Sequence, residues 1–149
     1  MSTKKITVIG ATGQIGRQLV ELLAADGHEV TGASRQTGVD AALGVGLDDV
    51  LRDADVVIDV LNSPSLEDDP ALAFFTATAA NISRAAKKAS VGHYIVLSIV
   101  GVDALQGGGY LRGKVVQERT ITQSGIPYTI VRATQFHEFT GLIAGSLVT

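Results

Sequence analysis

The sequence predicts an α/β fold in which helices cover both faces of a doubly wound parallel sheet. Short runs rich in Val, Ile and Leu alternate along the chain with longer segments that have helical spacing. Strands buried on both faces of a sheet have such near-continuous apolar runs, and their alternation with helices is typical of βαβ units. No linker or low-complexity segment divides the 149 residues, so we expect one domain over residues 1–149.

The strands are predicted from the apolar, β-branched runs. In chain order they cover residues 5–10, 29–33, 55–61, 93–99 and 128–132. A weak additional strand is expected near Val39, where Gly38 and the glycine-containing stretch 44–46 make the region short and irregular.

Three helices are predicted between these strands. The first covers residues 13–25, with Gly27 placed to end it. The second has Asp69 as its N-cap and Pro70 as its first residue, and its end near Gly92 is marked by Lys87 and Lys88. Its apolar positions keep helical spacing at 72, 75, 79, 82, 86 and 89. The third covers residues 110–123 and is closed by the turn 124–127.

Composition excludes several classes of protein. With 46% hydrophobic and 18% charged residues the chain is not a disordered one, and the absence of cysteine excludes a disulfide scaffold, a thiol nucleophile and a cysteine zinc site. A net charge of -3 gives no electrostatic footprint for nucleic acid. The apolar runs are too short for a signal peptide or a membrane span, so we expect a cytoplasmic protein without a membrane partner.

The segment ITVIGATGQIG, residues 6–16, is an expected strand that leads into a GxxGxxG turn and then a helix. Gly10 permits the tight turn, Gly13 lets backbone N–H groups approach a pyrophosphate, and Gly16 allows close helix–strand packing. Glycines at turns are ordinary, but this strand–turn–helix order predicts dinucleotide binding. Thr12 either donates its hydroxyl to phosphate or caps the helix. The turn residues expected to line the cofactor are Gly10, Thr12, Gly13, Gln14, Ile15 and Gly16.

The end of the second strand indicates which dinucleotide is bound. An NAD site usually has an acid there for the ribose 2′-hydroxyl, but residues 30–38 contain none. Arg35 could instead pair with a 2′-phosphate, with hydrogen bonds from Ser34 and Thr37. The alternative is that Arg35 is a solvated loop charge. The missing acid together with the basic side chain favours NADP over NAD.

A second group of residues combines Ser98, Tyr110 and Lys114. Tyr110 and Lys114 are four residues apart on a predicted helix, so their side chains share one face. Ser98 is at the carboxyl end of a strand, where ligands of open α/β sheets bind. A neighbouring ammonium that favours the phenolate would make the tyrosine useful in acid–base chemistry. The alternative is an aromatic ring that packs on a lysine stem.

The chain resembles the short-chain dehydrogenase/reductase superfamily, and more closely its atypical NmrA-like, NAD(P)H-binding branch, over nearly its whole length. The resemblance rests on GATGQIG at 10–16, NSPS at 62–65, LSIVGVD at 97–103, YLRGK at 110–114 and SGIPYTIVRATQF at 124–136. It implies a Rossmann fold in which Leu61, Asn62 and Ser63 line the cofactor. It also implies that Tyr110 and Lys114 complete the active site, that Lys114 holds the nicotinamide ribose, and that residues 132–136 pass near the nicotinamide.

Two features depart from this family. Glycines 107–109 directly precede Tyr110, so we expect a flexible loop there. Family members normally continue past the RATQF segment with further strands and helices, so we expect a chain that lacks most of the C-terminal substrate lobe. An apolar stripe at residues 136, 139, 142 and 143 would then be covered by a partner subunit in a homo-oligomer.

The remaining polar residues predict no metal site. The three histidines, His28, His93 and His137, are scattered along the chain and are interpreted as surface or strand-end residues. The acidic run 67–69 is explained by the start of a helix.

The residues predict an NADP(H)-dependent oxidoreductase that transfers a hydride to a small-molecule acceptor such as a carbonyl or quinone. Tyr110 would donate the proton, Lys114 would tune the tyrosine and bind the ribose, and Ser98 would hydrogen-bond the substrate. One alternative is a non-catalytic sensor or regulatory module that binds NADP(H), and another is an inactive, truncated cofactor-binding portion.

Overall fold

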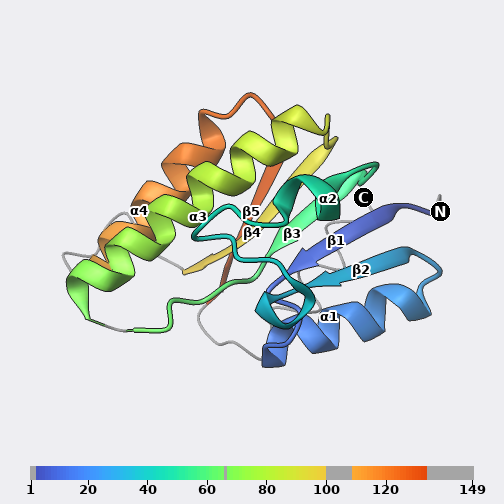
Figure 1. Cartoon of the computed structure of the whole chain (residues 1–149), viewed down its shortest axis with the longest axis horizontal. Coiled ribbons are helices and arrows are strands. Elements are labelled where there is room, and N and C mark those ends of the chain that lie inside the picture. Colours follow the sequence, from blue (N-terminus) through green and yellow to red (C-terminus); the bar gives the residue numbers. More distant parts are fainter. Residues whose placement is uncertain (1–2, 66, 100–108, 134–149) are drawn as a thin grey trace.

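The computed structural model describes residues 3–65, 67–99 and 109–133, and the strands in those residues form one parallel sheet of order β2-β1-β3-β4-β5 (Figure 1). The elements in chain order are β1 (Lys5–Ile9), α1 (Gln14–Ala25), β2 (Glu29–Ala33), a 3-10 turn (Arg35–Thr37), α2 (Leu47–Leu51), β3 (Val56–Asp59), α3 (Asp68–Lys88), β4 (His93–Ile99), α4 (Gly109–Thr122) and β5 (Tyr128–Ala133).

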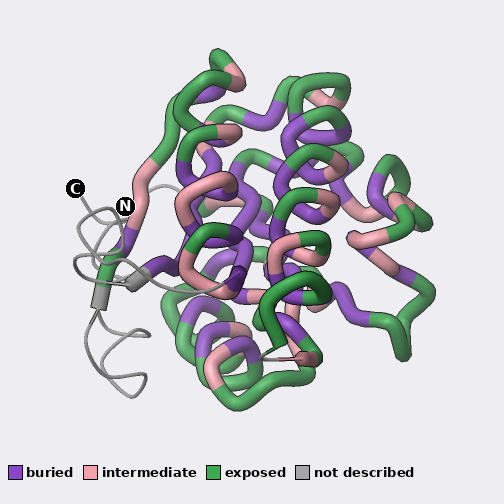
Figure 2. Tube along the Cα trace, turned by 90° about the vertical axis from the view of Figure 1, so that its left-hand side faces the viewer, coloured by how far each residue is buried: buried purple, intermediate pink, exposed green. Residues whose placement is uncertain are grey.

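Helices cover both faces of the sheet, as predicted. One core packs α1, through Leu19 and Leu23, against one face. The other core packs α2, α3 and α4 against the opposite face, with Leu51, Ile82 and Ile121 fully buried in it. Figure 2 shows the resulting pattern, in which buried and exposed residues alternate along each helix. The described part of the chain is therefore a Rossmann-like fold.

The predicted strands are confirmed with small changes at their ends. β2 and β4 have the predicted bounds, whereas β3 is shorter than 55–61 because its partner β1 ends at Ile9, opposite Asp59. α3 begins at Asp68, with Glu67 as its N-cap, which is two residues earlier than predicted. Pro70 then lies within the first turn, where its missing N–H has no intrahelical partner to lose.

The weak strand expected near Val39 is wrong. That region contains the 3-10 turn, an isolated antiparallel bridge between Asp40 and Val45, and the short helix α2, which the sequence did not predict. Gly38, Gly44 and Gly46 all have positive φ angles, which interrupt an extended strand. The side chain of Val39 nevertheless joins the core.

Several expectations lie outside the described residues. These are the behaviour of glycines 107 and 108, residues 134–136 of the RATQF segment, His137, and the apolar stripe at 136, 139, 142 and 143. Of the helices that the structure describes, none combines the length and apolar character needed to cross a membrane. The described residues also contain no group of three or more His, Asp or Glu side chains arranged to hold a metal ion.

Candidate functional site

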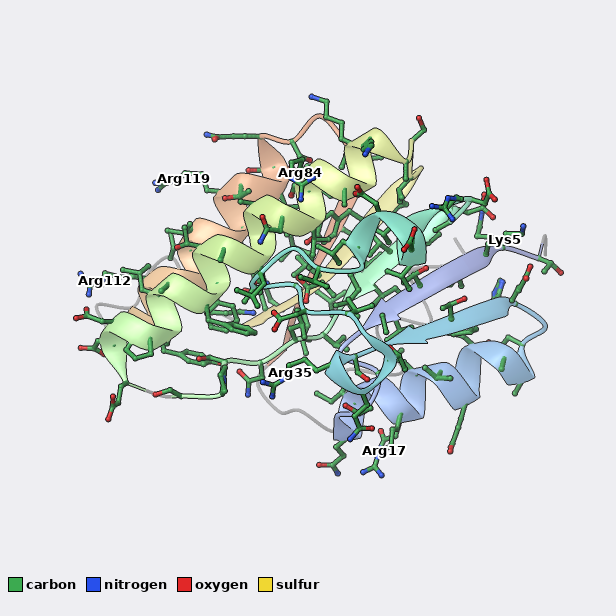
Figure 3. All side chains as sticks on the ribbon, in the orientation of Figure 1. Lys5, Arg17, Arg35, Arg84, Arg112 and Arg119 are labelled. Carbon is green, nitrogen blue, oxygen red and sulfur yellow. The ribbon has the colours of Figure 1, made fainter. Side chains whose placement is uncertain are left out.

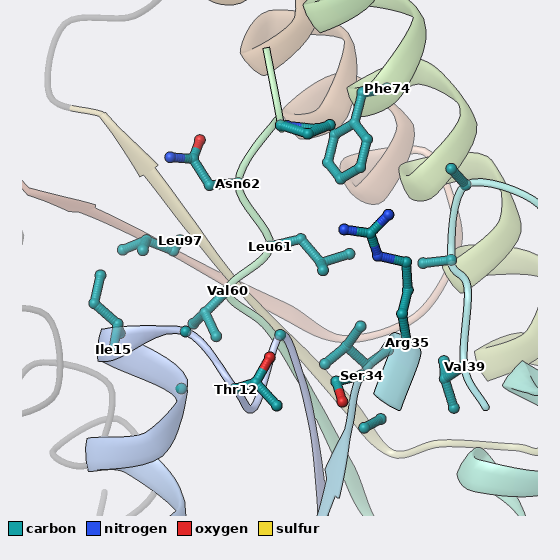
Figure 4. A pocket seen from close by; sticks show the side chains of 18 of the residues that line it. Thr12, Ile15, Ser34, Arg35, Val39, Val60, Leu61, Asn62, Phe74 and Leu97 are labelled. Atoms are coloured by element: carbon teal, nitrogen blue, oxygen red, sulfur yellow. The ribbon is translucent and has the colours of Figure 1, made fainter. Parts of the chain in front are cut away.

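A cavity of about 1070 Å³ opens at the carboxyl ends of the strands (Figure 4). It lies where the strand order reverses between β1 and β3, because β2 lies on one side of β1 and β3 on the other. Ligands of open α/β sheets bind in this crevice. The predicted residues in its wall are Gly10, Thr12, Gly13, Gln14, Ile15, Gly16, Ser34, Arg35, Leu61, Asn62, Ser98, Tyr110 and Lys114.

The glycine turn forms one wall of the cavity with its backbone. A Cβ atom on Gly16 would lie 2.0 Å from the carbonyl oxygen of Gly10, so the close packing expected at this position is present. Gly10 has a φ of +97°, and a Cβ there would lie 3.1 Å from the backbone of Val60. Gly13 is the N-cap of α1, without a side-chain cap and without an acid in the first turn. Backbone N–H groups at the start of α1 therefore remain available to an anion.

The end of β2 places Ser34 and Arg35 at the cavity. Ser34 is only 9% exposed, and its buried hydroxyl has no hydrogen-bond partner among the described residues. Arg35 is exposed and extends across the cavity towards Phe74 and Leu61 in Figure 4. Figure 3 shows the contrast with Arg112 and Arg119, which point outward from α4.

Thr37 does not belong to the cavity wall, so its expected contact with a 2′-phosphate stays a prediction. Its hydroxyl instead closes the 3-10 turn, because it donates to the Ser34 carbonyl and accepts from the Ser34 N–H, both at 2.9 Å. Asp40, which lies just beyond residues 30–38, also lines the cavity. One of its carboxylate oxygens accepts the Leu43 N–H at 3.1 Å.

Tyr110 and Lys114 lie together on one face of α4, as predicted, and both line the cavity. They share a contact with Phe75 of α3. The Tyr110 ring meets the Phe75 ring edge to face at 5.3 Å, and Lys114 Nζ lies 4.7 Å from the centre of the same ring. Tyr110 donates its hydroxyl to Asn62 Oδ1 at 2.7 Å, and Lys114 Nζ donates to the Leu97 carbonyl at 2.7 Å.

The lowered pKa expected for Tyr110 is wrong, because the net shift is upward. Burial raises the pKa of Tyr110, so the phenol keeps its proton at neutral pH. Burial also lowers the pKa of Lys114 to about 8, against the opposing attraction of Asp59 and Glu118. The neutral phenol of Tyr110 can act as a proton donor.

Ser98 lines the cavity but is only 1% exposed, and its hydroxyl donates to Glu118 Oε2. In this arrangement its proton is not directed at a substrate, so the predicted substrate contact stays a prediction. Ser63, like Thr37, does not line the cavity, and its hydroxyl donates to the Ser65 carbonyl at 2.6 Å within its own loop.

A buried polar network behind Lys114 was not predicted. In the register between the two strands, Ser98 of β4 lies opposite Arg132 of β5, and Glu118 of α4 accepts hydrogen bonds from both side chains. Asp59, at the end of β3, accepts from the Tyr94 hydroxyl and from Gln117 Nε2. A lone acid in an apolar strand was the available signal for Asp59, and the four-residue spacing from Lys114 was the signal for Glu118.

The start of α4 is held by α3 more tightly than the adjacent glycines suggest. The Gly109 N–H donates to Asp68 Oδ1 at 2.9 Å, and a Cβ on Gly109 would lie 1.8 Å from the Asp68 carbonyl oxygen. A Cβ on Gly113, one turn later, would lie 2.8 Å from Phe75 Cδ2. Gly109 therefore packs closely on the start of α3, and the flexibility expected of this loop stays a prediction.

Comparison with protein families gives one match to this chain. A family model described as NAD(P)H-binding matches residues 10–141, which include the glycine turn, Tyr110 and Lys114. Among curated proteins, none matches the sequence.

Solved structures share the fold at low identity. The oxidoreductase ylbE from Lactococcus lactis is 18% identical, with a TM-score of 0.81 over 97% of this chain and 85% of its own. WbmH from Bordetella bronchiseptica, solved with NAD+, is 20% identical, with a TM-score of 0.73 over 89% of this chain and 57% of its own. The dTDP-4-dehydrorhamnose reductase of Bacillus anthracis, solved with NADP, is 17% identical, with a TM-score of 0.74 over 90% of this chain and 54% of its own. The chain thus spans little more than half the length of the last two proteins.

Proposed function

The chain belongs to the NAD(P)H-binding family, and on that premise we propose that it is an NADP(H)-dependent oxidoreductase. The acceptor of the hydride is a carbonyl, a quinone or a similar small molecule. The observation that carries this proposal is the meeting of the glycine turn with Tyr110 and Lys114 in the wall of one cavity.

The cavity has the features that a dinucleotide requires. It is long enough to run from the end of β2, past the start of α1, to the face of α4 that carries Tyr110. Gly13 leaves the backbone at the start of α1 open to a pyrophosphate, since no side chain caps that helix. The residues present therefore fit the cofactor.

The distinction between NADP and NAD rests on the end of β2. The buried Ser34 hydroxyl lacks a partner among the described residues, and a phosphate oxygen would supply one. Arg35, the next residue, extends across the cavity towards Phe74 and Leu61 and offers the planar, charged donor group that binds phosphate well. Asp40 favours NAD, because a carboxylate can accept from the ribose 2′-hydroxyl. One of its oxygens, however, already accepts the Leu43 N–H within its own loop.

The residues around Tyr110 supply the proton that hydride transfer to a carbonyl requires. A reduced nicotinamide, when bound, supplies the hydride. The phenol of Tyr110 holds a proton at Oη and is positioned by Asn62 Oδ1. Lys114 carries an ammonium with three donors, of which one binds the Leu97 carbonyl, and the others are suited to ribose hydroxyls. The role proposed for Ser98 is the hydrogen bond to the substrate that its place at the end of β4 predicts.

Tyr110→Phe tests the enzymatic role. Without the hydroxyl the proton donor is lost, so we expect NADPH oxidation with a panel of carbonyls and quinones to fall by about a hundredfold or more, while NADPH binding is kept. Tyr128→Phe is the matched control, because Tyr128 is 44% exposed at the start of β5 and does not line the cavity. Unchanged turnover in the Tyr110 variant would reject the role.

The sensor is the second candidate, because the Ser98 hydroxyl donates to Glu118 and is not directed at a substrate. NADPH binding by the unaltered chain without turnover of any compound in the same panel would favour it over the enzyme. We also propose assignment to the NmrA-like branch, on the motif at 124–136, and a cytoplasmic location.

A further inference from the structure

Ser98 lies at the carboxyl end of β4, between the cavity and the polar network behind it. It is 1% exposed and lines the cavity, and its hydroxyl donates to Glu118 Oε2. Glu118 is one helical turn beyond Lys114 on α4 and does not line the cavity. A molecule in the cavity can therefore meet Ser98 without meeting the carboxylate that holds it.

Arg132 fixes Glu118 as an ionised acceptor. Glu118 Oε1 accepts from Arg132 Nη2 at 2.5 Å, and Oε2 accepts from Arg132 Nε at 3.3 Å as well as from Ser98. A guanidinium is always charged in proteins, and a carboxylate that accepts from it through both oxygens is ionised at neutral pH. Such a carboxylate has no proton to donate, so the proton between Ser98 and Glu118 belongs to the serine.

The direction of this hydrogen bond decides what Ser98 can offer to a ligand. A serine hydroxyl has one proton and two lone pairs. Because its proton is directed at Glu118, Ser98 has only lone pairs left for the cavity. A carbonyl or phosphate oxygen against Ser98 would then be an acceptor that faces another acceptor, and two buried groups without a shared proton destabilise a complex.

We propose that Ser98 accepts a hydrogen bond from the ligand, and that Glu118 is the positioning residue that makes it an acceptor. The ligand group against Ser98 is a hydroxyl or an N–H. On the proposed function, on which this inference rests, that group belongs either to the substrate or to the carboxamide of the nicotinamide. The first source restricts the substrate to carbonyl compounds with a hydroxyl or N–H next to the carbonyl, and it disfavours simple ketones and quinones.

Two related probes test the substrate as the source. Hydroxyacetone has a hydroxyl next to its carbonyl, and methoxyacetone has a methyl ether there, which accepts hydrogen bonds but cannot donate one. If the substrate supplies the donor, the kcat/KM for NADPH oxidation favours hydroxyacetone, and Ser98→Ala lowers this preference by about tenfold. The Ser98→Ala protein corrects for the difference in size and reactivity between the probes.

The nicotinamide is tested as the source by binding alone. The 3-acetylpyridine analogue of NADP+ has a methyl group where the carboxamide has its NH2 group. If the carboxamide supplies the donor, the unaltered chain binds NADP+ more tightly than the analogue, and Ser98→Ala lowers that preference by about tenfold. If Ser98→Ala changes neither the probe preference nor the nucleotide preference, the proposal is overturned.

Glu118→Gln separates the positioning role from a contribution to stability. The glutamine oxygen can still accept from Arg132, and its amide then donates to Ser98, so the serine proton becomes available to the cavity. We expect the preference that depends on Ser98 to disappear or to reverse, whereas a loss of stability alone would lower both members of the pair equally. Asp48→Asn, which removes an exposed carboxylate that pairs with Lys88, should keep the preference. An unchanged preference in folded Glu118→Gln would contradict the role of Glu118.

A measurement without ligand keeps this inference separate from the proposed function. In the unaltered, cofactor-free protein, NMR with labelled serine should detect a Ser98 hydroxyl proton that exchanges slowly with water, and the signal should be absent from Ser98→Ala. The hydroxyl of Ser90, which is exposed, is the control for fast exchange. Equally fast exchange at Ser98 would overturn the proposal, whether or not Glu118→Gln folds. If NADPH does not bind, the proposed function fails, and the hydroxyl signal still tests the bond from Ser98 to Glu118.

Discussion

The two walls of the cavity differ in composition: one is mainly backbone, and the other includes a buried charged side chain. The wall of β1, α1 and β2 is formed by backbone at Gly10, Gly13 and Gly16. The closest approaches are at Gly10 and Gly16, where an added Cβ would lie 3.1 Å and 2.0 Å from backbone atoms. The wall of β3, β4 and α4 includes the buried side chain of Lys114, and the buried carboxylates of Asp59 and Glu118 lie behind that wall. One wall therefore depends on the absence of Cβ atoms at its glycines, and the other depends on buried opposite charges that compensate one another.

The two walls should therefore fail in different ways. A backbone wall is broken by a single added carbon and is insensitive to pH, because it contains no titrating group. The charged wall keeps its shape when a carboxylate is replaced by an amide. The protein nevertheless loses stability, because the positive charge that the carboxylate compensated remains buried.

Gly16→Ala is expected to have the largest effect. Its new Cβ would lie 2.0 Å from the Gly10 carbonyl oxygen, and both atoms belong to or adjoin rigid backbone, so the turn must move. We expect a loss of about 3 kcal/mol or more in the free energy of unfolding and a loss of measurable NADPH binding. Urea unfolding and fluorescence titration measure the two quantities.

Gly92→Ala is the matched control for that change. A Cβ at Gly92 would lie 3.4 Å from the Asp55 carbonyl oxygen, which is an ordinary contact, and Gly92 is not among the glycines with positive φ. Its stability should change by less than about 0.5 kcal/mol. Similar losses in the two variants would show that the glycine wall is not specially close-packed.

Glu118→Gln tests the charged wall and should have a smaller effect. The substitution removes the carboxylate that pairs with Arg132 and attracts Lys114, although the Arg132 side chain is 42% exposed and keeps part of its hydration. We expect the free energy of unfolding at neutral pH to fall by about 2 kcal/mol.

The control for this variant is Asp48→Asn, which removes the carboxylate of an exposed ion pair with Lys88 at 3.1 Å. Exposed pairs contribute about 0.5 kcal/mol or less. If Glu118→Gln cost no more than Asp48→Asn, the buried network would not contribute to stability as the structure indicates.

The same division between the walls decides what could be predicted from sequence. The glycine turn was predictable because its requirement is local: a strand, three glycines and a helix follow one another within residues 5–25. The strands were predictable because β-branched, apolar runs are also local. α2 was missed, since the five residues that follow Gly46 are too few to show a helical period.

The charged wall could not be assembled from local patterns. Glu118 meets Ser98 and Arg132 only because β4 and β5 pair in a register that sets those two residues side by side. Asp59 meets Gln117 across 58 positions of sequence. The sequence contained Tyr110 and Lys114 as a pair, but the pKa shifts of both depend on burial, and that of Lys114 also depends on the carboxylates of Asp59 and Glu118.

The central claim, that the cavity holds NADP(H), is tested most directly by binding isotherms of the chain with NADPH and with NADH. The account predicts that NADPH binds at least about tenfold more tightly, that Arg35→Ala removes most of this preference, and that Arg119→Ala, on the outer side of α4, leaves it intact. Tighter or equal binding of NADH by the unaltered chain would contradict the assignment of Ser34 and Arg35, and binding of neither nucleotide would contradict the function itself.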